Sequence, residues 1–278
     1  MIFEVRARSG AVLPNLGLGT WRMGENASRR RDEVSALRMG LDLGMRLVDT
    51  AEMYGDGGAE EVVGEAIEGR RDEVFLVSKV LPHNATFDGT IRACEASLAR
   101  LATDRIDLYL LHWPGPHPLE RTVEAFRKLR ADGKILHWGV SNFDVDEMGA
   151  VAAIPDLAGC STDQVLYNLE RRGPERRLFP WCASRGIPIM AYSPLEQGRL
   201  RRTPALERVA ARHGATGEQI ALAWTLRLEE VVAIPKAGNP DHVRANARAA
   251  DLVLTEEDLA ELDRAYPLPE RDAPLETL

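Results

Sequence analysis

Four residues that can carry protons occur in order in the first half of this chain. Asp49, Lys79 and His112 each end a short apolar run, and Tyr54 follows Asp49 in a loop. A tyrosine ionises near pKa ~10 in water, so it needs a neighbouring cation to become a useful acid at neutral pH. Lys79 can be that cation if Asp49 is its counter-ion. The four residues therefore predict a site for proton transfer.

These residues can meet only if the apolar runs are parallel strands that end on one face of a sheet. We predict strands at 16–19, 47–49, 74–79, 108–112, 138–141, 163–167, 187–193 and 231–235. Apolar residues at three- and four-residue intervals predict amphipathic helices between them, among others at 32–44, 85–101, 119–132 and 218–228. Parallel strands that alternate with helices in this number indicate an α/β fold, a (β/α)8 TIM barrel, with its site at the carboxyl ends of the strands.

The two ends of the chain lie outside this repeat. Residues 2–8 alternate apolar and polar side chains, Ser9 and Gly10 indicate a turn, and a strand resumes at 11–13, which predicts a hairpin. The segment from Tyr266 is rich in proline and acidic residues, and we expect it to be irregular. Because a (β/α)8 barrel takes about 250 residues, the 278 residues of this chain favour a single domain over 1–278.

Composition and charge limit the partners of the protein. Hydrophobic residues make up 45% of the chain and charged residues 28%, which fits a soluble globular protein with a sizeable core. No window approaches the roughly 20 apolar residues of a membrane span, and no basic segment precedes an apolar one at the start. We therefore expect a cytoplasmic protein without a membrane partner. A formal net charge of −8 argues against a nucleic-acid partner, so any anion site must be a local cluster of cations.

The cysteines and histidines give no pattern that would bind a metal. Cys94, Cys160 and Cys182 are odd in number and widely spaced, as reduced packing residues are. The histidines lack zinc-ligand spacings such as H-E-x-x-H. No metal is expected.

The chain resembles the aldo-keto reductase family. Asp49, Tyr54, Lys79 and His112 match the catalytic tetrad of that family in identity, order and spacing. The match also includes the segments 17–21, 139–143, 191–195 and 234–236, so it runs through nearly the whole chain. The resemblance implies an NADPH-dependent oxidoreductase, with NADH also possible, that reduces aldehydes or ketones to alcohols. It further implies Tyr54 as the general acid and a hairpin that caps the barrel bottom.

The resemblance also implies roles for residues at the strand ends. His112 would orient the substrate carbonyl, and Trp21 and Trp113 would line the substrate pocket beside Tyr54 and His112. Tyr192 would stack on the nicotinamide ring, although a packed core tyrosine is the alternative. The residues expected to bind the cofactor are Gly19, Thr20, Trp21, Asp49, Ser141, Asn142, Gln164, Tyr192, Ser193, Pro194, Leu195, Gln197, Ile234, Lys236, Ala237, Gly238, His242 and Asn246.

Lys236 follows the last predicted strand and precedes a helix predicted to begin near Asp241. A phosphate beside a lysine at a helix N-terminus is physically sound, and barrels often bind phosphate after strands seven and eight. The resemblance implies that this phosphate is the adenosine 2′-phosphate of NADPH. The chain departs from the family pattern at Ala237, where serine is common, and at His242, where arginine is common.

Two other functions remain open at this point. A barrel aldolase could use Lys79 to form a Schiff base, and a regulatory or binding subunit could hold the cofactor with little turnover, as channel accessory subunits of this fold do. Among enzymes, the segments 49–54 and 112–113 are most similar to bacterial reductases of small 2-oxoaldehydes such as methylglyoxal. We therefore expect a small carbonyl substrate, and we expect a monomer.

Overall fold

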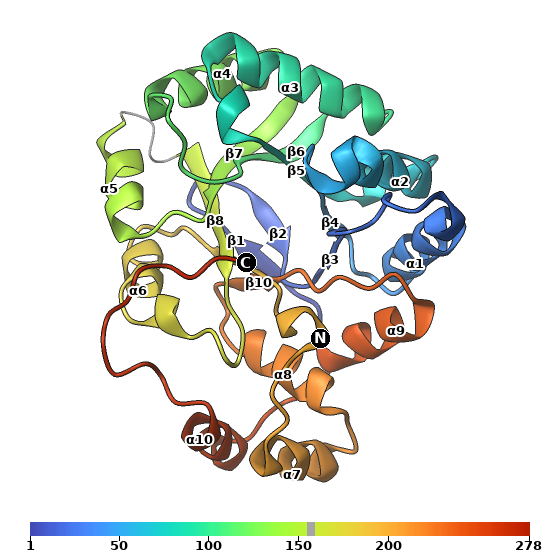
Figure 1. Ribbon diagram of the computed structural model, residues 1–278, viewed down its shortest axis with the longest axis vertical. Helices are drawn as coiled ribbons and strands as arrows, with labels where there is room; N and C mark the ends of the chain where they lie inside the picture. Colours follow the sequence, from blue (N-terminus) through green and yellow to red (C-terminus); the bar gives the residue numbers. More distant parts are fainter. Residues whose placement is uncertain (155–158) are drawn as a thin grey trace.

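Parallel strands form a barrel at the centre of the molecule, and helices surround it (Figure 1). In this computed structural model, which describes residues 1–154 and 159–278, eight strands follow one another around the sheet from β3 to β10. Parallel bridges from Leu16 to Ala233 and from Gly19 to Lys236 join the first strand to the last and close the barrel. The predicted (β/α)8 fold is confirmed.

The strands and helices lie within a few residues of the predicted ranges. The barrel strands are β3 (Gly17–Gly19), β4 (Leu47–Asp49), β5 (Phe75–Val80), β6 (Ile106–Leu111), β7 (Ile135–Ser141), β8 (Cys160–Leu166), β9 (Ile189–Tyr192) and β10 (Val231–Ala233). The α-helices are α1 (Arg30–Asp42), α2 (Gly58–Ile67), α3 (Phe87–Arg100), α4 (Leu119–Ala131), α5 (Val145–Ala153), α6 (Leu178–Ala183), α7 (Pro204–His213), α8 (Gly217–Thr225), α9 (Pro240–Ala249) and α10 (Glu256–Ala265). β7 begins three residues before its predicted start because Ile135 pairs with Ile106 of β6.

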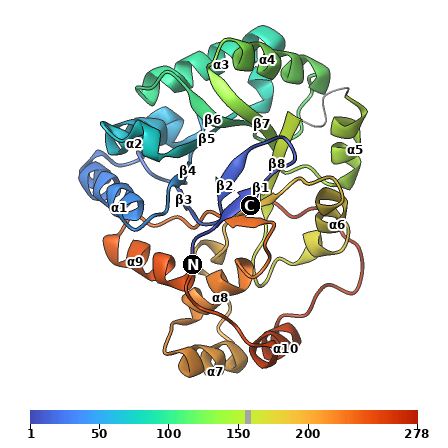
Figure 2. The same cartoon turned by 180° about the vertical axis from the view of Figure 1, so that it is seen from behind.

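The predicted hairpin consists of β1 (Glu4–Arg6) and β2 (Val12–Pro14), and Val5 pairs with Leu13. Figure 2 shows the hairpin lying across the barrel on the side turned away in Figure 1. Val5 and Leu13 are buried against apolar residues of the barrel interior, including Leu47 and Leu108. The hairpin therefore closes the bottom of the barrel, as predicted.

The alternation of side chains along each strand decides which residues face the lumen. In β4, Leu47 belongs to the apolar cluster inside the barrel, while Val48 packs in the cluster beneath the helices. Asp49 therefore points inward at the carboxyl end of the strand. The same alternation turns Lys79 inward, because Val77 lies in the lumen cluster. These side chains are thus directed to one point by the pleat of their strands.

The last helix, α10, is followed by an irregular segment, as predicted from its proline and acidic content. Arg171 forms ion pairs with Glu196 at 2.9 Å and with Glu276 at 2.8 Å, and these hold the segment over the upper face of the barrel. Among residues 1–154 and 159–278, no helix combines the length and apolarity needed to cross a bilayer.

Candidate active site

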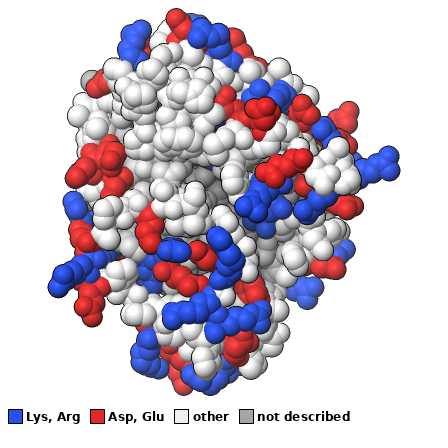
Figure 3. Space-filling view, in the orientation of Figure 1, with Lys and Arg blue, Asp and Glu red and all other residues white. Residues whose placement is uncertain are grey.

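A cavity of about 1570 Å³ opens at the carboxyl ends of the strands. Figure 3 shows this face of the molecule, with a hollow near its centre. Of the predicted site residues, those that line the cavity are Gly19, Thr20, Trp21, Asp49, Tyr54, His112, Trp113, Ser141, Asn142, Gln164, Tyr192, Ser193, Pro194, Leu195, Gln197, Ile234, Lys236, His242 and Asn246. Lys79, Ala237 and Gly238 do not line the cavity. Lys79 is buried beneath the lining residues, and Ala237 is buried in the core.

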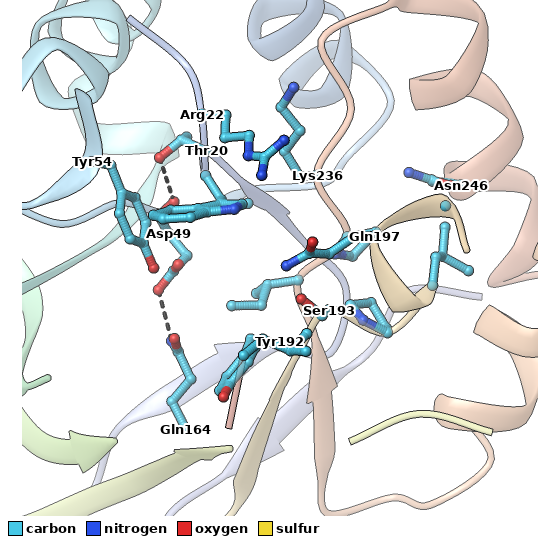
Figure 4. A pocket seen from close by; sticks show the side chains of 18 of the residues that line it. Thr20, Arg22, Asp49, Tyr54, Gln164, Tyr192, Ser193, Gln197, Lys236 and Asn246 are labelled. Atoms are coloured by element: carbon cyan, nitrogen blue, oxygen red, sulfur yellow. Dashed lines mark hydrogen bonds between the residues drawn. The ribbon is translucent and has the colours of Figure 1, made fainter. Parts of the chain in front are cut away.

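Lys79 connects the acid and the tyrosine of the predicted tetrad. Its Nζ donates to Asp49 Oδ2 at 2.8 Å, to the Thr50 carbonyl at 2.8 Å and to Tyr54 Oη at 3.1 Å. The second carboxylate oxygen of Asp49 accepts from Gln164 Nε2 at 2.7 Å (Figure 4). Lys79 is completely buried, so its charge is balanced inside the protein and not by water.

The loop after β4 brings Tyr54 back over Lys79. Lys79 Nζ lies 4.7 Å from the centre of the Tyr54 ring, and Trp21 contacts the same ring edge-to-face at 5.1 Å. The chain turns at Gly55, which has a φ of 58° and approaches the Met23 carbonyl so closely that a Cβ would lie 2.8 Å from that oxygen. Glycine is therefore required at this turn, and the turn fixes the direction of the tyrosine.

Burial and the pairing of charges shift the pKa values of this group in opposing directions. Burial raises the pKa of Tyr54, and the Lys79 ammonium opposes that rise. Burial alone would lower the pKa of Lys79, but Asp49 and Tyr54 together raise it above its ordinary value. Lys79 is therefore a cation at neutral pH, and Tyr54 keeps its proton. Lys79 does lower the Tyr54 pKa as expected, although the net direction in this protein is upward.

His112 follows β6 and lies beside Tyr54, with ring centres 5.7 Å apart. Burial and the nearby Lys79 lower the pKa of His112 well below its usual value, so the ring is neutral at pH 7. Its Nδ1 has no hydrogen-bond partner among the described residues. A neutral histidine can donate one N–H to a carbonyl oxygen, which suits orientation of a substrate better than delivery of a proton.

Amide and hydroxyl groups from β7, β8 and β9 line the cavity beside Asp49, Tyr54 and His112. Ser141 Oγ donates to the Gln164 carbonyl at 2.8 Å, and Asn142 Nδ2 donates to the His112 carbonyl at 3.1 Å. Tyr192 Oη donates to Asn142 Oδ1 at 2.9 Å. This wall therefore offers donors and acceptors but no charge, which fits a neutral amide such as the nicotinamide carboxamide.

The opposite end of the cavity carries cations. Lys236, His242 and Asn246 line the cavity as predicted. Figure 4 shows the side chains of Lys236 and Asn246. Arg22, Arg29 and further residues not predicted from the sequence also line the cavity. The signal that could have revealed them is the basic run at 29–31, close to the 17–21 motif in a chain with a net negative charge.

A second buried carboxyl group, Asp163, was also missed. It precedes Gln164 in β8 and points away from the lumen, where its Oδ1 accepts from the Phe143 amide at 3.5 Å. Its Oδ2 has no partner in the described part of the chain, and burial raises its pKa well above the ordinary value. Burial therefore favours the neutral form of this carboxyl group, and its contact with the Phe143 amide supports the loop that carries Asn142.

Comparisons with known proteins agree with this geometry. The sequence model of the Aldo/keto reductase family matches residues 15–267. Methylglyoxal reductase YeaE of Escherichia coli strain K12 is 52% identical over 267 residues, which are 94% of this chain and 94% of that protein. Glyoxal reductase of Bacillus subtilis strain 168 is 34% identical over 262 residues, 93% of this chain and 91% of that protein.

A crystal structure of an aldo/keto reductase from Klebsiella pneumoniae, in complex with NADP and acetate, has the same architecture. Its TM-score to this chain is 0.96, with 52% sequence identity over 100% of both chains. The agreement thus covers both the sequence and the barrel fold. This chain belongs to the aldo/keto reductase family.

Proposed function

We propose that the protein reduces the carbonyl group of small aldehydes or ketones to an alcohol, with NADPH as the hydride donor and Tyr54 as the proton donor. The observation that carries this proposal is the buried Lys79, which contacts Asp49 and Tyr54 at once. A fixed cation beside a tyrosine stabilises the phenolate that forms when the proton leaves. The geometry therefore favours proton donation by Tyr54.

The other residues align the reactants. His112 is neutral and lies at ring-contact distance from Tyr54, so it can hold the carbonyl oxygen where Tyr54 Oη can reach it. Asp49 holds Lys79, and Gln164 holds Asp49 in turn. The hydride is supplied by the nicotinamide when the cofactor is bound, so the protein needs only to bind, align and supply the acid.

The cavity fits a nicotinamide dinucleotide phosphate at both ends. Ser141, Asn142 and Gln164 offer the neutral donors and acceptors that a carboxamide needs, and Tyr192 borders them for stacking on the ring. Lys236 offers a cation for the 2′-phosphate at the far end. The NADP and NADPH complexes of the Klebsiella pneumoniae relatives support this choice of cofactor.

A small 2-oxoaldehyde such as methylglyoxal is the substrate class that we favour. The Escherichia coli relative is named a methylglyoxal reductase, and the Bacillus subtilis relative a glyoxal reductase. Trp21 and Trp113 are 38% and 36% exposed at the cavity rim, where they can enclose a small molecule beside Tyr54 and His112. Aromatic walls of this kind exclude water and bury apolar substrate surface.

The alternatives are now less favoured. The family membership confirms the predicted enzyme class and gives no support to a regulatory subunit without turnover. A Schiff-base aldolase would need an accessible lysine, whereas Lys79 is completely buried and its Nζ donates hydrogen bonds to three oxygen atoms. A cytoplasmic location, a monomeric state, the absence of a nucleic-acid partner and a single domain over 1–278 stay predictions from the sequence.

A screen of NADPH oxidation with small aldehydes, ketones and sugars tests the proposal. We expect steady turnover with 2-oxoaldehydes and weaker turnover with sugars, because Trp21 and Trp113 offer few hydrogen-bond partners for the hydroxyl groups of a sugar. The matched control is the Tyr54→Phe protein, which should bind NADPH but lose turnover. Tight NADPH binding by the wild type without turnover of any carbonyl compound would contradict the proposal.

A further inference from the structure

Two cations from distant parts of the chain meet at the adenosine end of the cavity. A Cβ placed on Gly238 would lie 3.3 Å from Lys236 Nζ and 3.4 Å from Arg29 Nη2, so both cationic groups border the same small space. Lys236 follows β10, whereas Arg29 ends the short 3-10 helix Ala27–Arg29 after β3. They meet because β3 and β10 are neighbours in the closed barrel, as the bridge from Gly19 to Lys236 records.

Within the described residues, neither cation forms an ion pair with a carboxylate. No ion pair joins Arg29 or Lys236 to an acidic residue within 1–154 and 159–278, whereas the next residue, Arg30, pairs with Glu61 at 3.0 Å and Glu65 at 2.9 Å. Glu33 lies nearby, with its Cγ 3.9 Å from the same point, but one of its carboxylate oxygens accepts from the Gly24 amide at 3.0 Å. Partial burial and the nearby Arg29 lower the pKa of Lys236, and the carboxylates of Glu33 and Glu25 only partly oppose this shift.

We propose that Arg29 and Lys236 together bind the 2′-phosphate of NADPH. This inference rests on the proposed function, which places that phosphate at Lys236. It assigns to Arg29 the second cation that the family pattern places at residue 242, where this chain has His242. The specificity for NADPH would then depend on a residue that follows β3, the strand that closes the barrel against β10.

The geometry suits a phosphate. Charge-assisted N–H···O contacts are roughly 2.8 Å long, so two nitrogen groups that border one point can each reach a different oxygen of the same dianion. Arginine adds a planar fork of donors that matches two phosphate oxygens, which lysine alone cannot do. Binding of the dianion would also relieve the repulsion between the two cations.

The experiment compares the dissociation constants of NADPH and NADH in the Arg29→Gln protein, measured by fluorescence titration. We expect the affinity for NADPH to fall by about tenfold or more and that for NADH to change less than about twofold, because only NADPH carries the phosphate. Arg31→Gln is the matched control, since Arg31 is an exposed arginine nearby that does not line the cavity. It should change neither affinity.

Binding of adenosine 2′,5′-bisphosphate and adenosine 5′-phosphate by calorimetry gives a readout without the nicotinamide. Arg29→Gln should weaken only the bisphosphate, and Arg29→Lys should retain most of the affinity because it keeps the charge. Equal losses for both nucleotides would assign Arg29 to the pyrophosphate or adenine and overturn the inference, as would no loss at all.

The same titrations with Lys236→Ala distinguish the role of Arg29 from the proposed position of the 2′-phosphate. If Lys236→Ala weakens NADPH selectively but Arg29→Gln does not, the inference about Arg29 is wrong and the proposed phosphate position stands. If neither variant alters the ratio of NADPH to NADH affinity, the proposed 2′-phosphate position is itself wrong.

Discussion

The two ends of the cavity hold charge in opposite ways. At the catalytic end, Lys79 is completely buried and its ammonium contacts Asp49, the Thr50 carbonyl and Tyr54. At the adenosine end, Arg29 and Lys236 are exposed, and within the part of the chain that the structure describes neither has a carboxylate partner. One end is already neutralised by the protein, and the other leaves its positive charge for a ligand.

This difference predicts how the two ends respond to substitution. Removal of one buried charge leaves its partner unpaired in a medium of low dielectric, so effects at the catalytic end should be large and coupled. Charges at the adenosine end are screened by water and salt, so effects there should be smaller and limited to the ligand's own phosphate. Substitutions at the two ends of the cavity, and at its rim, test this contrast.

Tyr54→Phe removes one hydroxyl and keeps the ring, so folding and NADPH binding should survive. We expect kcat/KM for carbonyl reduction to fall by about two to four powers of ten, the usual scale of general acid catalysis. In the wild type, kcat/KM should fall as pH rises through the Tyr54 pKa, because reduction needs the protonated form. Burial raises that pKa, which places the limb at alkaline pH.

The pH profile also separates Tyr54 from His112. The pKa of His112 is lowered well below its usual value, so an imidazolium acid would lose its activity as the pH rises through the acid range and would give no alkaline limb. The alkaline limb should be absent from the residual activity of Tyr54→Phe. Persistence of that limb in a folded, cofactor-binding variant would show that another group supplies the proton.

Lys79→Met tests the coupling of the buried charges. Turnover should fall nearly as far as in Tyr54→Phe, and stability should fall by about 3–5 kcal/mol because Asp49 loses its partner. In the double variant Lys79→Met/Asp49→Asn, the unfolding temperature should return toward that of the wild type, whereas kcat should stay low. If the double variant unfolds at the same temperature as Lys79→Met, an unpaired Asp49 is not the cause of the instability.

Lys236→Ala tests the adenosine end. The affinity for NADPH should fall by about one to two powers of ten, since a charge-assisted contact is worth about 1.5–3 kcal/mol. The affinity for NADH should change little, and thermal stability should not change, because no buried partner is left behind. An equal loss of affinity for both cofactors in a fluorescence titration, or a clear loss of thermal stability, would contradict the proposed difference between the two ends.

Trp113→Ala should have the smallest effect, because this residue is exposed at the rim and bears no charge. We expect the ranking of small and aromatic aldehydes in kcat/KM to change by about tenfold or less, with unchanged NADPH affinity. Unchanged relative kcat/KM across the aldehydes would assign Trp113 to packing alone.

The barrel and the residues that meet at the carboxyl ends of its strands could be predicted from the sequence. Strand and helix periods repeat along the chain, and Asp49, Lys79 and His112 each end a strand or directly follow one, so local patterns were sufficient to bring them to one face. The position of Tyr54 near these residues could also be predicted, because it lies only five residues after Asp49. Short-range spacing carries this information because neighbouring parallel strands end at the same edge.

The meeting of Arg29 with Lys236 and the burial of Asp163 depend on tertiary packing. Arg29 lies in an irregular loop whose course depends on barrel closure, and no periodicity predicts where its long side chain reaches. Asp163 occupies a strand whose outward face is covered by other elements. Its neighbours in sequence therefore could not show that its Oδ2 would have no hydrogen-bond partner among the described residues. Contacts that depend on which distant element covers a residue are set by packing, and local patterns do not encode them.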